Sequence, residues 1–103
     1  MKSLDTMTSD ERNLLLYLET RAVDYGGLVD TKHMNKEDMD IAKKWNEEGF
    51  LKFGRIRFHS ITSAGTYWCE LPNEVWNLAH TERKARCLRI MFKQTIDKTY
   101  DHK

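Results

Sequence analysis

The chain has 103 residues, enough for one ordinary domain that buries a core without disulfides or a structural metal. Its 17 basic and 16 acidic residues leave a formal net charge of +1, so total charge predicts neither nucleic acid, nor a membrane, nor an acidic substrate as the partner. Two cysteines, Cys69 and Cys87, form no CxxC pair, which predicts reduced thiols and a cytoplasmic protein. The first residues lack the apolar core of a secretory signal, and no stretch reaches the roughly 18 apolar residues of a membrane span.

Three segments of the N-terminal half predict helix or turn. The first helix begins near Thr8 or Ser9, with Ser9 as the candidate N-cap, and ends at Gly26-Gly27. Residues 28–35 are too short for a long helix and predict a residue or two of strand, then one or two helical turns. Asn35 is the next candidate N-cap, for a helix that Gly49 ends. The apolar faces of the two longer helices are Leu14, Leu15, Leu18 and Ala22, and Met34, Ile41, Ala42 and Trp45.

A β-hairpin is predicted next. Residues 50–59 are rich in aromatic and β-branched side chains, 60–65 form a turn, and 66–71 return. The apolar side of the first strand changes parity at Gly54, which predicts a bulge or twist there. Tyr67 and Cys69 are expected on one side of the second strand, and Trp68 on the other.

The last predicted element is the longest helix, about 73–95, which begins after Pro72. No internal repeat or linker divides the chain, so we expect a single domain over 1–103. Its core would lie within about 8–79, and residues 96–103 would form a frayed tail. The expected fold class is mainly α with a small β-hairpin.

This order of elements resembles the winged helix-turn-helix superfamily, in particular its MarR- and PadR-like branches. The similar stretches are WNEEGFLKFGRI, which leads into the hairpin, and CELPNEVWNLA, which leads out of it. The resemblance implies a winged helix with a long C-terminal helix. It also implies binding to double-stranded DNA, with the helix after Asn35 in the major groove and the hairpin on the adjacent backbone or minor groove. A transcriptional regulator is the function it suggests.

The residues themselves give this hypothesis uneven support. The helix after Asn35 carries acids as well as lysines, so a solvated face of mixed charge is the alternative reading. The hairpin has an uninterrupted basic cluster, for which the alternative is an edge strand that uses charge against aggregation. The candidate DNA-binding residues are Lys32, His33, Asn35, Lys36, Lys43, Lys52, Arg55, Arg57 and His59.

The last helix carries two further groups. Arg86, Arg89 and Lys93 form a basic stripe, either a solvated face or a contact for nucleic acid or an acidic partner. Its apolar residues need a cover, which is either a second copy of the chain, giving a homodimer, or the first helix. Trp68 is either an exposed anchor for a partner protein or is covered by a neighbouring helix. The candidate partner- or dimer-binding residues are Trp68, Leu88, Ile90, Met91 and Phe92.

Motifs of catalysis are absent from the sequence. It has no HExxH, CxxC, GxSxG, Walker loop or dinucleotide fingerprint, and its four histidines lack metal-ligand spacing. We therefore expect no enzyme, no cofactor and no metal. The alternative to DNA binding is a protein-interaction module of accessory or phage type that uses the same fold.

Overall fold

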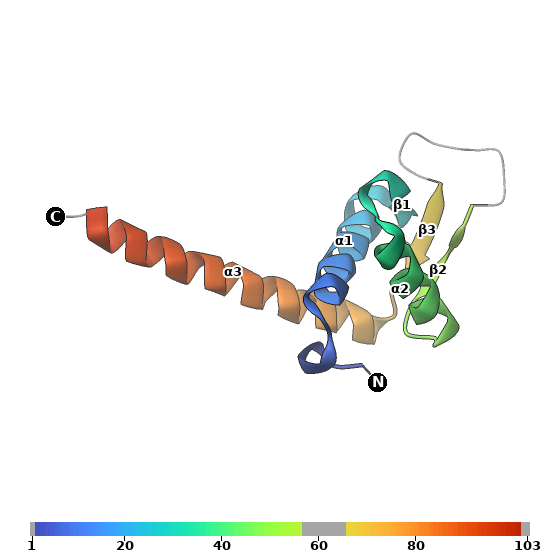
Figure 1. Cartoon of the computed structure of the whole chain (residues 1–103), viewed down its shortest axis with the longest axis horizontal. Coiled ribbons are helices and arrows are strands. Elements are labelled where there is room, and N and C mark those ends of the chain that lie inside the picture. Colours follow the sequence, from blue (N-terminus) through green and yellow to red (C-terminus); the bar gives the residue numbers. More distant parts are fainter. Residues whose placement is uncertain (1, 57–65, 102–103) are drawn as a thin grey trace.

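The structure is a computed structural model that describes residues 2–56 and 66–101, with side chains through Gln94. The chain is mostly helical and carries one small antiparallel sheet (Figure 1). The elements are η1 (Leu4–Thr6), α1 (Ser9–Tyr25), β1 (Leu28–Val29), η2 (Thr31–His33), α2 (Lys36–Glu47), β2 (Lys52–Arg55), β3 (Tyr67–Glu70) and α3 (Asn73–Asp101). The mainly α fold class with a β-hairpin is therefore confirmed.

Side-chain caps fix where the first two helices begin. Thr8, rather than the expected Ser9, caps α1, because its hydroxyl accepts the Glu11 N–H while the Glu11 carboxylate accepts the Thr8 N–H. Asn35 caps α2 as expected, in the same reciprocal arrangement with Asp38. Gly26 ends α1 at φ 62°, a left-handed conformation that glycine adopts without strain.

The sheet has three strands in the order β1-β3-β2, all antiparallel. The short strand β1 pairs with β3, so that Leu28 lies opposite Trp68 and Val29 opposite Tyr67. The expected bulge at Gly54 is wrong, because the β2–β3 register continues without an insertion from Lys52 to Arg55. Glycine gives room there for another reason: a Cβ at position 54 would lie 3.1 Å from the Trp68 indole nitrogen, so the indole would have to shift by a few tenths of an ångström.

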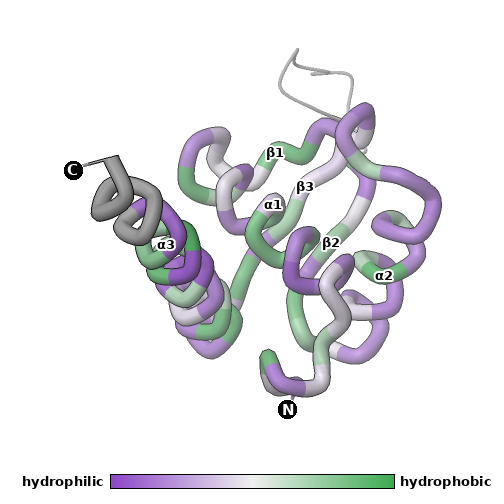
Figure 2. The backbone as a smooth tube through the Cα atoms, turned by 60° about the vertical axis from the view of Figure 1, so that its left-hand side comes forward, coloured by the Kyte–Doolittle hydropathy of each residue, from purple (hydrophilic) through white to green (hydrophobic). Residues whose placement is uncertain are grey.

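One core holds these elements together. Helix α1 lies between α2 and α3 and also contacts the sheet (Figure 2). Leu15, Leu18, Trp45, Leu51 and Val75 are almost wholly buried, one or more from each of α1, α2, the segment before β2, and α3. The apolar faces predicted for α1 and α2 are these core faces. Such burial of large side chains supplies most of the free energy that opposes unfolding.

Helix α3 divides into two parts. Val75, Ala79 and Glu82, at i, i+4 and i+7 spacing, are buried where the helix crosses α1. Beyond them the helix runs away from the rest of the molecule (Figure 1) and continues to Asp101, past the expected end at Thr95 and through part of the expected tail. No helix in the described part of the chain combines the length and apolar character that crossing a bilayer requires.

Candidate nucleic-acid interface

The turn η2 and the start of α2 place four of the predicted DNA-binding residues together. Lys32 and Lys36 are exposed, and no ion pair joins either to another described residue. His33 is also exposed, with its Nε2 3.9 Å from the Asp30 carboxylate. Asn35 is at the surface too, but its side-chain oxygen accepts the Asp38 N–H and so is already engaged as the helix cap. Two lysines therefore remain as unpaired cations at this end of α2.

The outer face of α2 is mixed in charge, as its sequence predicted. Lys43 is exposed and without an ion pair among the described residues, but Glu37 and Asp40 are exposed on the same helix. Asn46, which could otherwise have read a base, has a structural role: its Oδ1 accepts the Phe53 N–H at 3.1 Å and ties α2 to β2. This helix carries three exposed lysines, Lys36, Lys43 and Lys44, interrupted by acids, rather than a continuous positive band.

The hairpin strands carry Lys52 and Arg55, which differ in their partners. Lys52 pairs with Glu70 on the neighbouring strand at 3.3 Å, with both side chains well exposed. Arg55 lies opposite Tyr67 at the end of β2 and is exposed. Among the arginines that the structure describes, Arg55 alone has no side-chain hydrogen bond or ion pair. Arg57 and His59 lie outside the described residues.

These positions share one end of the molecule. Figure 1 shows η2, the start of α2 and the end of the hairpin strands where Arg55 faces Tyr67, all on the side away from the free end of α3. Tyr17 holds this end to α1, because its hydroxyl donates a 2.6 Å hydrogen bond to the Asp30 carbonyl immediately before η2. Burial raises the pKa of the Tyr17 hydroxyl, although Arg21 nearby lowers it, so this donor keeps its proton at neutral pH. Lys32, Lys36 and Arg55 are thus exposed on the body of the molecule, away from the free end of α3.

Trp68 lies on the outer side of the sheet. Its side chain is 37% exposed, and its indole covers Gly54 on the neighbouring strand. The neighbouring strand therefore supplies part of the cover of Trp68. The exposed remainder of the ring is available to a partner.

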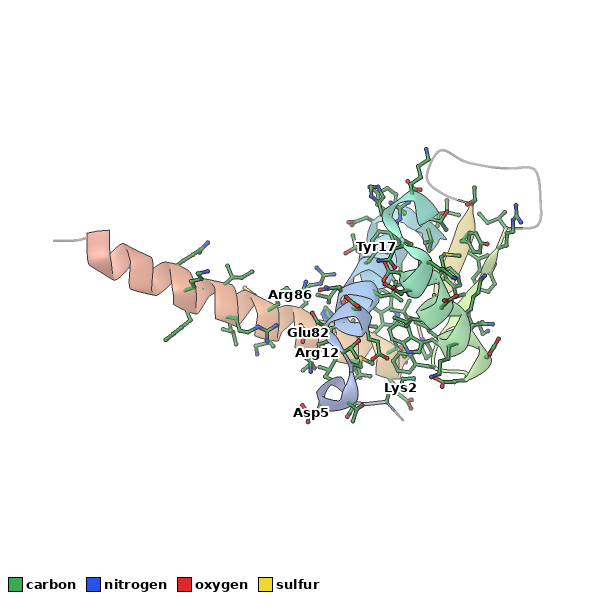
Figure 3. The ribbon with its side chains drawn as sticks, viewed as in Figure 1. Lys2, Asp5, Arg12, Tyr17, Glu82 and Arg86 are labelled. Atoms are coloured by element: carbon green, nitrogen blue, oxygen red, sulfur yellow. The ribbon has the colours of Figure 1, made fainter. Side chains whose placement is uncertain are left out.

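Two buried acids that sequence reasoning missed account for most of the basic residues at the base of α3. Glu19 of α1 is 3% exposed and accepts from Arg83 Nε, and Arg83 Nη2 also donates to the Leu16 carbonyl at 3.1 Å. Glu82 is 3% exposed and lies 3.1 Å from Arg89 Nη2 and 3.7 Å from Arg86 Nη2. Figure 3 shows Glu82 and Arg86 where α3 crosses α1.

These pairings revise the predicted basic stripe. Arg86 and Arg89 are not simply solvated, because both pair with Glu82, but its one carboxylate balances only one of their two positive charges. A sequence signal for this existed: Glu82 follows Ala79 by three positions and Val75 by seven, which places an acid within the buried face of a helix. Buried carboxylates require such cationic partners.

The apolar residues of α3 that we expected to need a cover do not pack on α1. The exposed fractions are 55% for Leu88, 52% for Ile90, 53% for Met91 and 70% for Phe92. The alternative in which α1 covers them is therefore wrong for this chain by itself. Exposed Cys87 lies in the same region, with its sulfur 3.6 Å from that of Met91.

The second cysteine lies inside the sheet. Burial raises the pKa of the Cys69 thiol to about 11, and the thiol donates to the Leu18 carbonyl at 3.6 Å. A thiol of this kind is a poor nucleophile at neutral pH, because the thiolate is the reactive form. In residues 2–56 and 66–94 no three His, Cys, Asp or Glu side chains gather as a metal site would need.

The structure thus has two exposed features: basic side chains without ion pairs on η2, α2 and the hairpin, and apolar side chains on the outer part of α3. Comparison of the chain with protein-family models, with curated proteins and with solved structures finds no match.

Proposed function

We propose that this protein binds double-stranded DNA through η2, the start of α2 and the hairpin, and that it acts as a small transcriptional regulator of winged-helix type. The proposal rests on which basic side chains lack a partner within the protein. Arg55 has no internal partner, whereas every other described arginine has one, and Lys32 and Lys36 lie unpaired at the same end. Unpaired cations on one surface are what phosphate contacts require.

The topology supports the same proposal. A helix, a short strand, a turn, a second helix and a hairpin follow one another, and β1 joins the sheet beside β3. In a winged helix this order brings the second long helix and the hairpin to one nucleic-acid surface. In this chain α2 packs against β2, and the Phe53 N–H donates a hydrogen bond to Asn46 Oδ1 between them. Function does not follow from such a fold alone, and the charges have to be tested.

The acids of α2 define what kind of DNA contact is proposed. Glu37 and Asp40 would repel phosphates if the whole length of α2 lay in a major groove. We therefore place the closest approach at the N-terminal end of α2 and at the hairpin. Phosphate contacts there would position the protein with little base readout, since no exposed arginine lies on α2.

The test measures binding of a fluorescent random-sequence duplex by anisotropy at several salt concentrations. Binding should weaken steeply with salt, by roughly a hundredfold from 50 to 200 mM if about four phosphates are contacted. Lys36→Gln with Arg55→Gln should lower affinity by about tenfold for each charge removed near 0.1 M salt. Lys84→Gln with Lys93→Gln is the matched control, because it removes two exposed charges from α3 instead.

Equal losses in the two double variants would contradict the proposed surface. Absence of binding at the lowest salt would contradict DNA binding altogether and would favour the protein-interaction module. All of these side chains are exposed, so circular dichroism should show the same fold in each variant.

A further inference from the structure

A cavity of about 640 Å³ lies between the start of α3 and the turn that joins α2 to β2. Its walls come from three separate segments of the chain: the N-terminal residues, the turn after α2, and the junction of β3 with α3. The lining residues are Lys2, Glu48, Gly49, Phe50, Pro72, Asn73, Glu74 and Val75. The volume is in the range of sites that hold small organic molecules. None of the candidate site residues named from the sequence lines this cavity.

The N-terminal wall of the cavity is held in place by contacts with the rest of the fold. Lys2 Nζ lies 2.8 Å from the Glu48 carboxylate, which joins this segment to the end of α2 (Figure 3). Arg12 of α1 donates two hydrogen bonds to the Leu4 carbonyl, at 3.2 and 2.7 Å. Met7 is buried and belongs to the core. The cavity is therefore formed within the single chain, and a ligand that enters it has little wall to reorder.

Apolar side chains supply the inner surface of the cavity. Phe50 and Val75 are buried members of the core, and the ring of Pro72 lies beside them in the lining. The Phe50 ring packs edge-on against Trp45, with the two centroids 5.2 Å apart, so the core sets its orientation. A flat apolar body gains most from such a surface, because aromatic rings pack on one another in defined geometries.

The charges around the cavity leave one carboxylate without a partner. One lysine and two glutamates line it, and Lys2 pairs with Glu48, whose pKa is lowered by the hydrogen bond from Lys2. Glu74 is exposed, and no described residue pairs with it. The two helix ends in the lining offset each other, because the C-terminal end of α2 carries partial negative charge and the N-terminal end of α3 partial positive charge. The negative charge of Glu74 is therefore not balanced within the cavity.

We propose that this cavity binds a small organic cation, an amine carried on a flat apolar body. The apolar body lies against Phe50, Pro72 and Val75, and the ammonium group lies beside Glu74. An anion of the same shape meets the carboxylates instead, and like charges repel. The cavity borders the C-terminal end of α2, whereas the proposed DNA contact uses its N-terminal end, so this inference goes beyond DNA binding and does not depend on it.

The first test compares two ligands that differ only in charge. Tryptamine carries an ammonium group, and indole-3-propionate carries a carboxylate at the end of the same indole-ethyl body. Titrations of isotope-labelled protein, followed by backbone amide shifts, locate each ligand and measure its Kd. Tryptamine should bind with a Kd of about 1 mM, as expected for a ligand of its size at ordinary efficiency. Indole-3-propionate should bind at least about tenfold more weakly.

Two variants separate the charge in the cavity from acidic surface in general. Glu74→Gln keeps the shape of the side chain and should weaken tryptamine binding by about threefold or more. Glu37→Gln is the matched control, because it removes an exposed acid at the far end of α2, and it should leave the Kd within about 1.5-fold. Both side chains are exposed, so circular dichroism should show an unchanged fold.

A third pair of variants fills the cavity without changing its charge. Asn73 lines the cavity and is exposed, so Asn73→Phe places a ring in the space assigned to the ligand. Asn77 is exposed one turn later on α3 and does not line the cavity, so Asn77→Phe is the control. Tryptamine binding should weaken at least about tenfold in the first variant and stay within about twofold in the second.

Four results would each overturn the proposal. They are the absence of tryptamine binding, equal affinities for the two ligands, equal losses within either pair of variants, and amide shifts centred away from Gly49, Phe50 and Glu74. None of these readouts involves DNA, so failure here leaves the DNA proposal to its own test.

Discussion

The two charged regions of the molecule use their cations in opposite ways. At the crossing of α1 and α3, Glu19 and Glu82 are buried and hold three arginines between them. At the end formed by η2, α2 and the hairpin, Lys32, Lys36 and Arg55 are exposed and have no ion pair with a described residue. Charge at the first region therefore fixes how α3 leaves the body, and charge at the second region is free for a ligand.

This comparison shows that the number of basic residues in a segment does not by itself locate a surface that can bind an anionic ligand. Arg86 and Arg89 form a regular basic stripe in the sequence, yet the fold pairs both with the single carboxylate of Glu82, which offsets half of their charge. Arg55 is a single residue, yet it keeps its charge available. Availability of a cation depends on tertiary neighbours, because an ion pair cancels much of its field.

The largest expected effect concerns Cys69, which lies on the core-facing side of the hairpin. If only the outer side of the hairpin is exposed, reagents in solution should reach Cys69 very slowly. In a Cys87→Ser variant, a thiol reagent at pH 8 should modify Cys69 about a hundredfold more slowly in the folded than in the urea-unfolded protein. This factor follows from a pKa of about 11 in the fold against the ordinary 9.0. Equal rates in the two states would contradict a closed inner side.

The same pKa predicts how stability depends on pH. The folded state favours the neutral Cys69 thiol, since its pKa is raised above the ordinary value. The stabilisation is therefore complete below about pH 9 and is lost as the pH rises through about 11. Urea unfolding at pH 8 and pH 10.5, compared with Cys69→Ala, should show a larger loss at high pH in the protein that has the thiol.

The second effect concerns the buried acids. Glu19→Ala should lower the free energy of unfolding by about 2 kcal/mol. This is less than the roughly 3–5 kcal/mol of a fully buried pair, because the Arg83 side chain is 47% exposed and water can solvate the charge left behind. Urea unfolding measures the change. Glu47→Ala removes an exposed acid of α2 and should stay within about 0.5 kcal/mol of wild type; an equal loss in both variants would contradict the structural role of Glu19.

The third effect compares single cations in the two regions. Lys32→Gln should weaken binding of random duplex DNA by up to about tenfold near 0.1 M salt and lower the salt slope by about one. Arg89→Gln should leave affinity within about twofold, because Arg89 pairs with Glu82 on α3, outside the proposed DNA surface. Anisotropy titrations measure both, and a larger effect of Arg89→Gln would place the DNA on α3 instead.

The smallest effect concerns the ion pair on the hairpin. Lys52 and Glu70 are 68% and 66% exposed and lie 3.3 Å apart, so the pair should contribute less than about 0.5 kcal/mol to folding. A double-mutant cycle with Lys52→Ala and Glu70→Ala, measured by urea unfolding, isolates this coupling. A coupling as large as the loss in Glu19→Ala would remove the distinction between exposed and buried charge on which the comparison rests.

The sequence by itself determined the helices, their core faces and the hairpin. The Asn35 cap, the αL glycine at position 26 and the apolar spacing are local signals that the backbone obeys wherever the segment lies. The same locality explains the small error at Thr8, since Thr8 and Ser9 are both good caps and only the reciprocal bond of Glu11 selects one.

Only the tertiary structure decided which polar residues are available. Asn46 joins α2 to β2 by a hydrogen bond, Gly54 leaves room for the Trp68 indole, and Glu82 forms ion pairs with two arginines. Each outcome depends on a neighbour brought close by folding rather than on spacing along the chain. Hydrogen bonds and ion pairs act over a few ångströms, so sequence patterns can place a charge on a helix face but cannot state what lies opposite it.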